Sequence, residues 1–243
     1  MNSIEITNLT KRYKGGIVAL DNINFCVEHG VFGLLGHNGA GKSTLMKSLV
    51  TVLPPTSGTI SVCGFDTKSQ GNEVRKRIGY LPQELTMYPS LSVIDFVSYM
   101  AELKGVYDKN FVKSVLGQVE MLAFSKRKIG QLSGGMKRRV GIAQALVGNP
   151  EILIIDEPTA GLDPEERVRF RGVLSRFAKD GKTVLLSTHI VEDVYQLCDK
   201  LAVLRKGQLF YTGTSAALME RAEGKVKIIC LENETQLIEL QKR

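Results

Sequence analysis

Gly36-His37-Asn38-Gly39-Ala40-Gly41-Lys42-Ser43-Thr44 matches the phosphate-loop pattern G-x-x-x-x-G-K-[ST]. Glycines let the backbone turn several N–H groups towards one phosphate without obstruction by a Cβ atom, and the positive end of a following helix adds attraction. Such a loop must lie between a strand and a helix. An apolar run at 31–35 precedes the pattern, and a helical run at 45–52 follows it until two prolines stop it. This order favours a phosphate loop over a chance glycine turn.

The residues of this loop have distinct candidate roles. Lys42 would reach the β- and γ-phosphates of a nucleotide, and the Ser43 hydroxyl would bind Mg²⁺. The other residues would contribute mainly backbone N–H groups. The candidate nucleotide-binding residues of the loop are Gly36, Asn38, Gly39, Ala40, Gly41, Lys42, Ser43 and Thr44.

A second stretch supplies acids that a magnesium–nucleotide site needs. Four aliphatic residues at 152–155 are followed by Asp156 and Glu157. A buried strand that ends in two charges is costly unless those charges are used. We expect Asp156 on the metal side and Glu157 as the general base for a water that attacks the γ-phosphate. The alternative, a strand that merely ends in exposed acids, is weakened by the phosphate loop.

The rest of the chain alternates between strands and helices. Ser92 with Asp95, and Asp163 before Pro164, are typical of helix starts. This alternation predicts a mostly parallel sheet covered on both faces, with a helical lobe inserted at about 86–148. Further strands are expected at 4–6, 23–27, 59–62, 183–187, 201–204 and 208–211, and further helices at 164–179 and 190–198. The segment after 62 reads as a polar linker, and the last 30 residues as a weakly patterned extension.

Composition excludes several classes of protein. The chain has 243 residues, 43% of them hydrophobic, which is enough for one large domain or a core with an inserted lobe. Its longest apolar run has four residues, whereas a membrane-spanning helix needs about 20. The start of the chain has no secretory signal pattern. Four widely separated cysteines, Cys26, Cys63, Cys198 and Cys230, read as reduced core thiols of a cytosolic protein.

The net charge of +7 raises nucleic acid or an anionic membrane as a partner until the charges are located. Residues 121–150 hold six cations and no acid, so the other 213 residues carry only +1. The cations are Lys126, Arg127, Lys128, Lys137, Arg138 and Arg139. They flank the segment Leu132-Ser133-Gly134-Gly135-Met136, so we interpret the surplus as a local field around that segment. A solvated helix face is the alternative for Arg138 and Arg139.

With the two preceding motifs, the segment at 132–136 resembles the ATP-binding cassette family, the nucleotide-binding subunits of ABC transporters. The resemblance covers about residues 3–215. It implies an α/β phosphate-loop NTPase core with a mostly parallel sheet, an N-terminal antiparallel β subdomain and an inserted α-helical subdomain. The nucleotide-binding domain would span 1–215, with a C-terminal extension at 216–243.

The resemblance also implies a dimer. Ser133, Gly134 and Gly135 open a helix and so form a second anion-binding terminus without a lysine. In the family this terminus closes on the γ-phosphate held by another cassette. Two chains, most simply two identical ones, would enclose two ATP molecules head to tail, with Mg²⁺ at each site.

Three further residues match family positions. Tyr13 stands where an aromatic side chain stacks on adenine, although an ordinary strand tyrosine is the alternative. Gln83 resembles the glutamine that senses Mg²⁺ and the attacking water. His189 resembles the switch histidine that contacts the γ-phosphate. The loop Gly161-Leu162-Asp163 resembles the one that communicates across the dimer, and Asp163 also suffices as a helix cap.

Two positions depart from the family. His37 replaces a common proline of the phosphate loop, and Met136 replaces the glutamine that often ends the signature segment. Neither change removes the residues with the anion-binding role. We therefore expect an active ATPase in which Lys42, Gln83, Glu157 and His189 are catalytic.

The expected function is that of an ATP-hydrolysing subunit that drives a separate transmembrane permease from the cytoplasmic face of the membrane. The segments 87–93 and 188–193 resemble exporter cassettes of the antibiotic- and drug-export group, and an importer cassette is the first alternative. A soluble ATPase acting on ribosomes or DNA is disfavoured by the single phosphate loop and the short helical insertion, so no nucleic-acid partner is expected. A regulator without turnover is disfavoured by Glu157 and His189.

Overall fold

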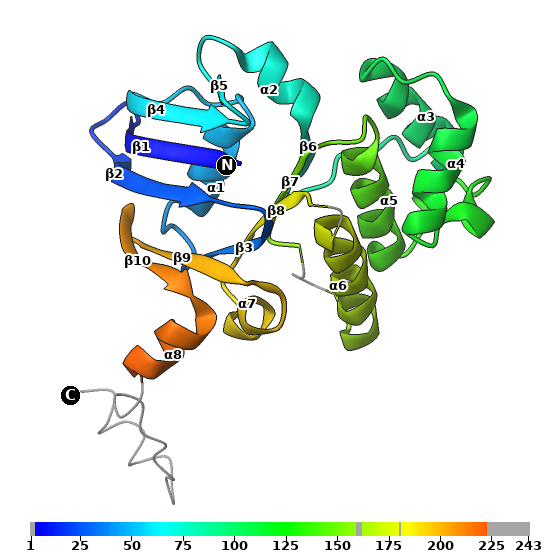
Figure 1. The fold of residues 1–243 in the computed structure, drawn as a ribbon. Coiled ribbons are helices and arrows are strands. Elements are labelled where there is room, and N and C mark those ends of the chain that lie inside the picture. Colours follow the sequence, from blue (N-terminus) through cyan, green and yellow to red (C-terminus); the bar gives the residue numbers. More distant parts are fainter. Residues whose placement is uncertain (1–2, 159–161, 180, 223–243) are drawn as a thin grey trace, which may run out of the picture.

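The computed structural model describes residues 3–158, 162–179 and 181–222. They form two β-sheets with helices around them (Figure 1). The strands are β1 (Ile4–Arg12), β2 (Val18–Val27), β3 (Gly30–Leu35), β4 (Ser57–Val62), β5 (Phe65–Asp66), β6 (Ile78–Leu81), β7 (Ile152–Asp156), β8 (Thr183–Thr188), β9 (Lys200–Arg205) and β10 (Gln208–Thr214). The α-helices are α1 (Lys42–Leu49), α2 (Gly71–Arg77), α3 (Val93–Leu103), α4 (Lys109–Gln118), α5 (Gly134–Leu146), α6 (Pro164–Lys179), α7 (Val191–Leu197) and α8 (Ser215–Ala222).

The larger sheet has the strand order β10-β9-β3-β8-β7-β6. Neighbouring strands from β9 to β6 run parallel, and β10 pairs antiparallel with β9. Parallel strands covered on both faces are apolar throughout, and β7 is buried along its whole length. Ile152 and Ile154 belong to one hydrophobic core, and Leu153 and Ile155 to the other. The mostly parallel α/β sheet that the sequence predicts is confirmed.

The smaller sheet is antiparallel and has the order β2-β1-β4-β5. Its inner side chains share one hydrophobic core with α1 and with one face of the larger sheet. Ile4 of β1, Leu20 of β2 and Leu45 of α1 are fully buried there. In Figure 1 this sheet lies with the N-terminus on the side of the molecule away from α3 and α4. The N-terminal antiparallel part implied by the family resemblance is therefore present.

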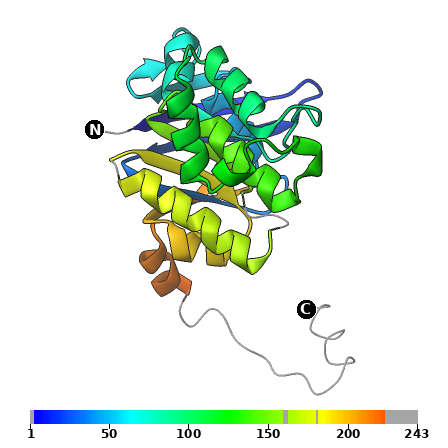
Figure 2. The same ribbon diagram turned by 90° about the vertical axis from the view of Figure 1, so that its right-hand side faces the viewer.

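Helices α3, α4 and α5 gather on the other side, where Figure 2 shows them in front. Two helix starts match the sequence signals. The Ser92 side chain accepts a hydrogen bond from the Asp95 backbone N–H, and Asp163 accepts one from the N–H of Glu166. All three helices lie within the stretch 86–148 for which the sequence predicts a helical lobe, while the domain limit at 215 remains a prediction.

The structure has elements that the sequence patterns did not predict. The segment interpreted as a polar linker contains β5, α2 and β6, and the expected C-terminal extension begins with α8. The four-residue strand β6 is an edge strand that pairs in parallel with β7. This pairing is non-local, so no local sequence pattern predicts it. None of the helices in the described parts of the chain has the length and apolar composition needed to cross a membrane.

The cysteines do not share one environment. Cys198 is buried, and desolvation raises the pKa of its thiol to about 12. Cys26 is exposed, so the interpretation of it as a core thiol is wrong. It lies on the outward face of β2 between the buried Phe25 and Val27, as the alternation of a strand requires. Cys63 is intermediate, and Cys230 lies outside the described residues.

Candidate nucleotide site

The predicted phosphate loop connects β3 to α1. Gly41 precedes the helix with φ +106, a left-handed conformation, and a Cβ atom there would lie 2.6 Å from the Ala19 carbonyl oxygen. A Cβ on Gly36 would lie 2.6 Å from the Leu204 carbonyl oxygen. Glycine is therefore required at both ends of the loop by conformation or close packing. The sequence prediction of a strand, a glycine loop and a helix in this order is confirmed.

The N-terminus of α1 has no side-chain cap. The first N–H groups of a helix lack intrahelical partners and favour an anion. Lys42, the first residue of the helix, is 4% exposed, and its ammonium group donates to the carbonyls of Gly36 at 2.7 Å and His37 at 3.3 Å. It also lies 3.3 Å from Glu157 Oε1. Lysine, backbone amides and an acidic strand end thus meet at one place.

Glu157 is the centre of the site. Its Oε1 lies 3.3 Å from Lys42 Nζ and 3.4 Å from His189 Nδ1, and its Oε2 accepts a hydrogen bond from Gln83 Nε2 at 3.3 Å. The residue is 8% exposed. Its backbone has φ +46, which is uncommon for a residue other than glycine. The structure therefore brings the other three predicted catalytic residues together around the Glu157 carboxylate.

Asp156 lies beside this centre at the end of β7. It is 2% exposed, and its carboxylate accepts a hydrogen bond from the Ser187 hydroxyl. The same hydroxyl oxygen accepts the Glu157 backbone N–H at 3.0 Å. Burial, with the Asp156 charge close by, raises the pKa of Tyr80 to about 12, so this phenol stays protonated. Ser187, whose role the sequence did not reveal, orients both acids.

The donors present fit a magnesium ion. Mg²⁺ prefers oxygen ligands, commonly one or two from the protein with phosphate and water completing the shell. Asp156 supplies a buried carboxylate at the strand end, and Ser43 supplies a hydroxyl in the first turn of α1. Gln83, also predicted to sense the metal, contacts Glu157 rather than Asp156. We therefore assign Asp156 and Ser43 as the residues that would hold the ion.

A cleft of about 350 Å³ opens on the loop. Its lining includes Ile17 from the β1–β2 connection, Val18 and Ala19 from the start of β2, and Lys42 and Glu157. Tyr13 is 40% exposed in the β1–β2 connection, and its hydroxyl lies 3.3 Å from Thr44 Oγ1. The predicted adenine-stacking tyrosine is thus next to the phosphate loop, although it is absent from the lining of the cleft. The cleft combines an apolar wall with phosphate-binding groups, as a nucleotide requires.

The signature residues Ser133, Gly134 and Gly135 begin α5. The Ser133 side chain caps the helix by accepting the Met136 backbone N–H at 3.2 Å. Among the described residues, no hydrogen bond or ion pair joins these three residues to Lys42 or Glu157. They do not belong to the cleft on α1 of the same chain. Of the loop at 161–163, Asp163 caps α6, and Gly161 lies outside the described residues.

Two cations near the signature segment are not on a solvated face. Arg138 and Arg139 are each 8% exposed, because α5 is buried on nearly all sides. Arg139 forms ion pairs with Glu166 at 3.2 Å and Glu120 at 3.9 Å. Arg138 donates only to backbone carbonyls within the described chain. The alternative of a solvated helix face is therefore wrong for both arginines.

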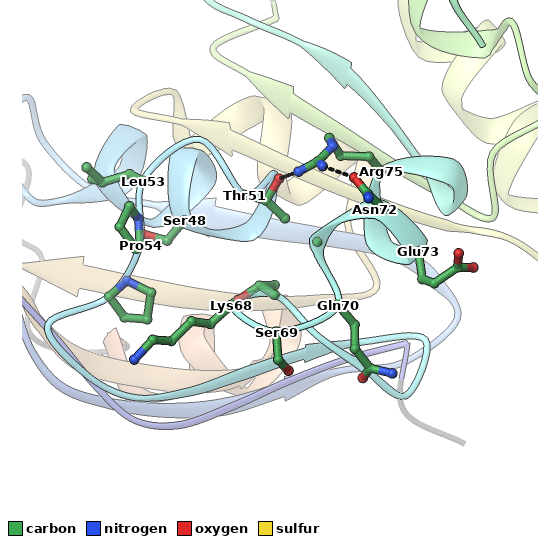
Figure 3. Close-up of a pocket in the computed structure, with 13 residues that line it drawn as sticks. Ser48, Thr51, Leu53, Pro54, Lys68, Ser69, Gln70, Asn72, Glu73 and Arg75 are labelled. Carbon is green, nitrogen blue, oxygen red and sulfur yellow. Dashed lines mark hydrogen bonds between the residues drawn. The ribbon is translucent and has the colours of Figure 1, made fainter.

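A larger cavity, of about 600 Å³, contains none of the predicted site residues. It lies between the C-terminal end of α1, with the prolines at 54–55, and the segment that leads into α2. Figure 3 shows the Arg75 guanidinium group between Thr51 and Asn72, to which it donates hydrogen bonds. The supposed linker is thus tied to α1, and volume alone does not identify the functional site.

Fold and site define a nucleotide-binding α/β protein of the phosphate-loop class. The family described as ABC transporter matches residues 20–160. The chain is 38% identical over 229 residues to the Nod factor export ATP-binding protein I of Burkholderia lata, covering 91% of this chain and 74% of that protein. It is 34% identical over 226 residues to the ABC transporter ATP-binding protein NatA of Bacillus subtilis, covering 89% and 92%.

One solved structure is similar to this chain over nearly the whole length of the solved chain. It is the dimeric structure of a post-hydrolysis state of the ATP-binding cassette MJ0796 bound to ADP and Pi. The TM-score is 0.79 at 28% identity, and the match covers 87% of this chain and 98% of that one. The chain belongs to the ABC transporter family, as an ATP-binding cassette.

Proposed function

We propose that this cassette hydrolyses ATP as one of two nucleotide-binding subunits and drives a separate transmembrane permease. The observation that carries the proposal is the Glu157 carboxylate, held within 3.4 Å of Lys42, Gln83 and His189 side-chain atoms. A buried acid in reach of a lysine, an amide and an imidazole can bind and activate a water beside a phosphate. A protein that only bound nucleotide would not need this arrangement.

Each residue has a defined part in the proposed reaction. Glu157 orients the attacking water and takes its proton, and Gln83 holds Glu157 from the opposite side. Lys42 and the uncapped amides of α1 stabilise negative charge on the transferring phosphoryl group, and His189 adds a contact from the end of β8. When bound at Ser43 and Asp156, Mg²⁺ supplies further charge neutralisation. Tyr13 provides an aromatic face for the base.

The dimer follows from the signature segment. Ser133, Gly134 and Gly135 lie at a helix start that, within the described residues, forms no hydrogen bond or ion pair with Lys42 or Glu157 of its own chain. In the proposed dimer they contact the nucleotide held by Lys42 of the opposite subunit, so ATP joins the two chains. The similar cassette MJ0796 has a structure described as dimeric. Loss of the γ-phosphate would remove the shared contact and reopen the dimer.

The permease partner and the direction of transport rest on relatives. The Burkholderia lata relative is named an export ATP-binding protein, and another Bacillus subtilis relative, 35% identical over 225 residues, is named a linearmycin resistance ATP-binding protein. These names support export. In the proposal, residues 1–215 form the motor domain and act on the membrane subunit from the cytoplasmic face. The names favour export over import and over a role with ribosomes or DNA.

The substitution Glu157→Gln tests the proposed chemistry. The amide keeps the size and hydrogen bonding of the side chain but cannot accept the proton, so ATP-dependent dimerisation should persist while turnover falls by about a thousandfold. Size-exclusion chromatography with MgATP measures the dimer, and phosphate release measures turnover. A variant that hydrolyses ATP at the normal rate would refute the role of Glu157. A wild-type chain without MgATP turnover would refute the proposed function.

A further inference from the structure

All three nitrogens of the Arg138 guanidinium group donate hydrogen bonds to backbone carbonyls. The group has five N–H donors, and five carbonyl oxygens accept from it. Nε donates to Pro158, Nη1 to Gln83 at 2.9 Å and Pro82 at 3.4 Å, and Nη2 to Glu157 at 2.8 Å and Asp156 at 3.1 Å. The side chain is buried, so these bonds are shielded from water.

The five carbonyls belong to the two segments that carry the catalytic pair. One is the segment after β6 that ends at Gln83, and the other is the end of β7 with Glu157. The Gln83 and Glu157 side chains already meet, with Nε2 3.3 Å from Oε2. Arg138 therefore joins the main chains of the same two residues whose side chains touch. A change in the position of Arg138 would alter the geometry of that contact.

Arg138 is five residues from Ser133 along α5, which corresponds to about 7.5 Å of helix. Ser133 begins the helix that the proposed function places on the nucleotide of the opposite subunit. Because a helix turn is stiff, a displacement of its first residue is passed to the next turn. One end of α5 thus serves the opposite site, and its second turn serves the site of its own chain.

We infer that Arg138 is a positioning residue that couples the signature end of α5 to Gln83 and Glu157 of the same chain, so that ATP bound at one site of the dimer sets turnover at the other. This inference rests on the proposed function, because it requires a dimer with two ATP sites. It assigns a role to an arginine whose hydrogen bonds, within the described residues, all go to backbone carbonyls.

Lys104 provides a matched control within the same chain. It follows α3, and its ammonium group donates to the carbonyls of Arg75 at 2.6 Å and Ile78 at 3.2 Å. It therefore also ties the helical side of the molecule to main-chain carbonyls of the sheet side. Desolvation lowers the pKa of Lys104 and that of Arg138, although Lys104 is the more exposed of the two residues. In the part of the chain that the structure describes, no hydrogen bond or ion pair joins Lys104 to a predicted catalytic residue. Its replacement therefore measures the effect of losing a side-chain link between helix and sheet without touching the catalytic residues.

The test compares Arg138→Met, Arg138→Lys and Lys104→Met in the full chain. We measure phosphate release against MgATP concentration and the thermal midpoint of each variant. Arg138→Met should lower kcat by about a hundredfold, since small misplacement of catalytic groups has effects of that size, with KM changed less than about twofold. For the wild-type dimer of the proposed function we expect a Hill coefficient above 1, and in Arg138→Met it should fall to 1. Arg138→Lys, which keeps the charge and three donors, should recover about tenfold of the lost kcat.

Lys104→Met should lower the thermal midpoint but keep kcat and the Hill coefficient within about twofold. The inference is overturned if Arg138→Met keeps both quantities, or if Lys104→Met loses them equally at an equal loss of thermal midpoint. If Arg138→Met does not fold, Arg138→Lys decides, because it should fold with a reduced kcat and a Hill coefficient of 1. In each of these outcomes the wild-type chain hydrolyses ATP, whereas failure of the proposed function appears as a wild-type chain that does not.

Discussion

Helices α1 and α5 both begin at residues predicted to contact a phosphate, and their first turns are built differently. At α1, Gly41 is left-handed and offers no side chain to the first N–H groups. At α5, the Ser133 side chain already accepts the N–H of Met136. The first helix start is open to an anion, and the second is capped within its own chain.

Because of this difference, the two helix starts can contribute differently to binding a triphosphate. The open start of α1 offers backbone amides, and Lys42 adds a full positive charge, so it can hold a nucleotide without help. At α5 the Ser133 oxygen accepts from the helix, but its hydroxyl proton remains available as a donor. The α5 start can therefore add one hydrogen bond to a phosphate already held elsewhere. Under the proposed function, α1 would therefore bind the nucleotide strongly, and α5 of the opposite subunit would recognise the bound state.

The largest effect is expected at Lys42. In Lys42→Met a buried charge-assisted contact to phosphate is lost, and such contacts contribute about 1.5–3 kcal/mol each. MgATP affinity should fall by roughly a hundredfold, since 1.4 kcal/mol corresponds to tenfold. Lys47→Met, at an exposed position of the same helix, is the control and should bind normally. Isothermal titration of both variants measures the difference, and equal affinities would show that α1 binds through its amides alone.

A smaller effect is expected from adding a Cβ atom at the glycine that precedes α1. Gly41→Ala places a Cβ atom 2.6 Å from the Ala19 carbonyl and forces alanine into a left-handed conformation, at a cost of about 2 kcal/mol. The free energy of unfolding in urea should fall by that amount. Gly39→Ala is the control, because it has a left-handed φ of +80 but no atom within 4 Å of its Cβ. If both variants lose equal stability, the close contact with Ala19 contributes nothing.

The smallest effect on stability is expected at Ser133. Ser133→Ala removes the cap and should cost about 1 kcal/mol, whereas Ser133→Asp keeps a capping oxygen and should cost almost nothing. The aspartate, however, places a negative charge where the opposite phosphate would lie. ATP-dependent dimerisation, measured in the Glu157→Gln background, should weaken with alanine and be absent with aspartate. A stable dimer of the aspartate variant would remove Ser133 from the phosphate contact.

Much of the fold could be predicted from short sequence patterns. Patterns of only a few residues predict the phosphate loop, the buried strand before Asp156 and the helix starts at Ser92 and Asp163. Such patterns do not predict the strand β6, because its pairing with β7 joins segments more than 70 residues apart in sequence, and the edge position of a four-residue strand leaves no periodic signal. The polar segment before it folds as α2 through contacts such as Arg75 with Thr51, which are equally non-local.

The candidate site also contains residues that local motifs predict and residues whose roles depend on distant parts of the chain. Lys42 and Glu157 follow from motifs, and the meeting of Gln83 and His189 with Glu157 was expected only through the family resemblance. The buried state of Arg138 was missed because its strongest acceptors, the carbonyls of Gln83 and Glu157, lie 55 and 19 residues away. The signal that could have found it is the nearly uninterrupted small and apolar sequence at 140–147, which predicts a helix buried on all sides.

The order of the larger sheet has a consequence for how the chain acquires its site. Strands β3, β8 and β7 are neighbours in space, and their carboxyl ends carry the phosphate loop, His189 and Glu157. In the sequence they are separated by the whole helical region and by α6. A chain in which this sheet is incomplete has no nucleotide site. ATP would therefore bind only chains in which the larger sheet is complete. Its binding would shift the folding equilibrium towards these chains by mass action, so the substrate also stabilises the folded state.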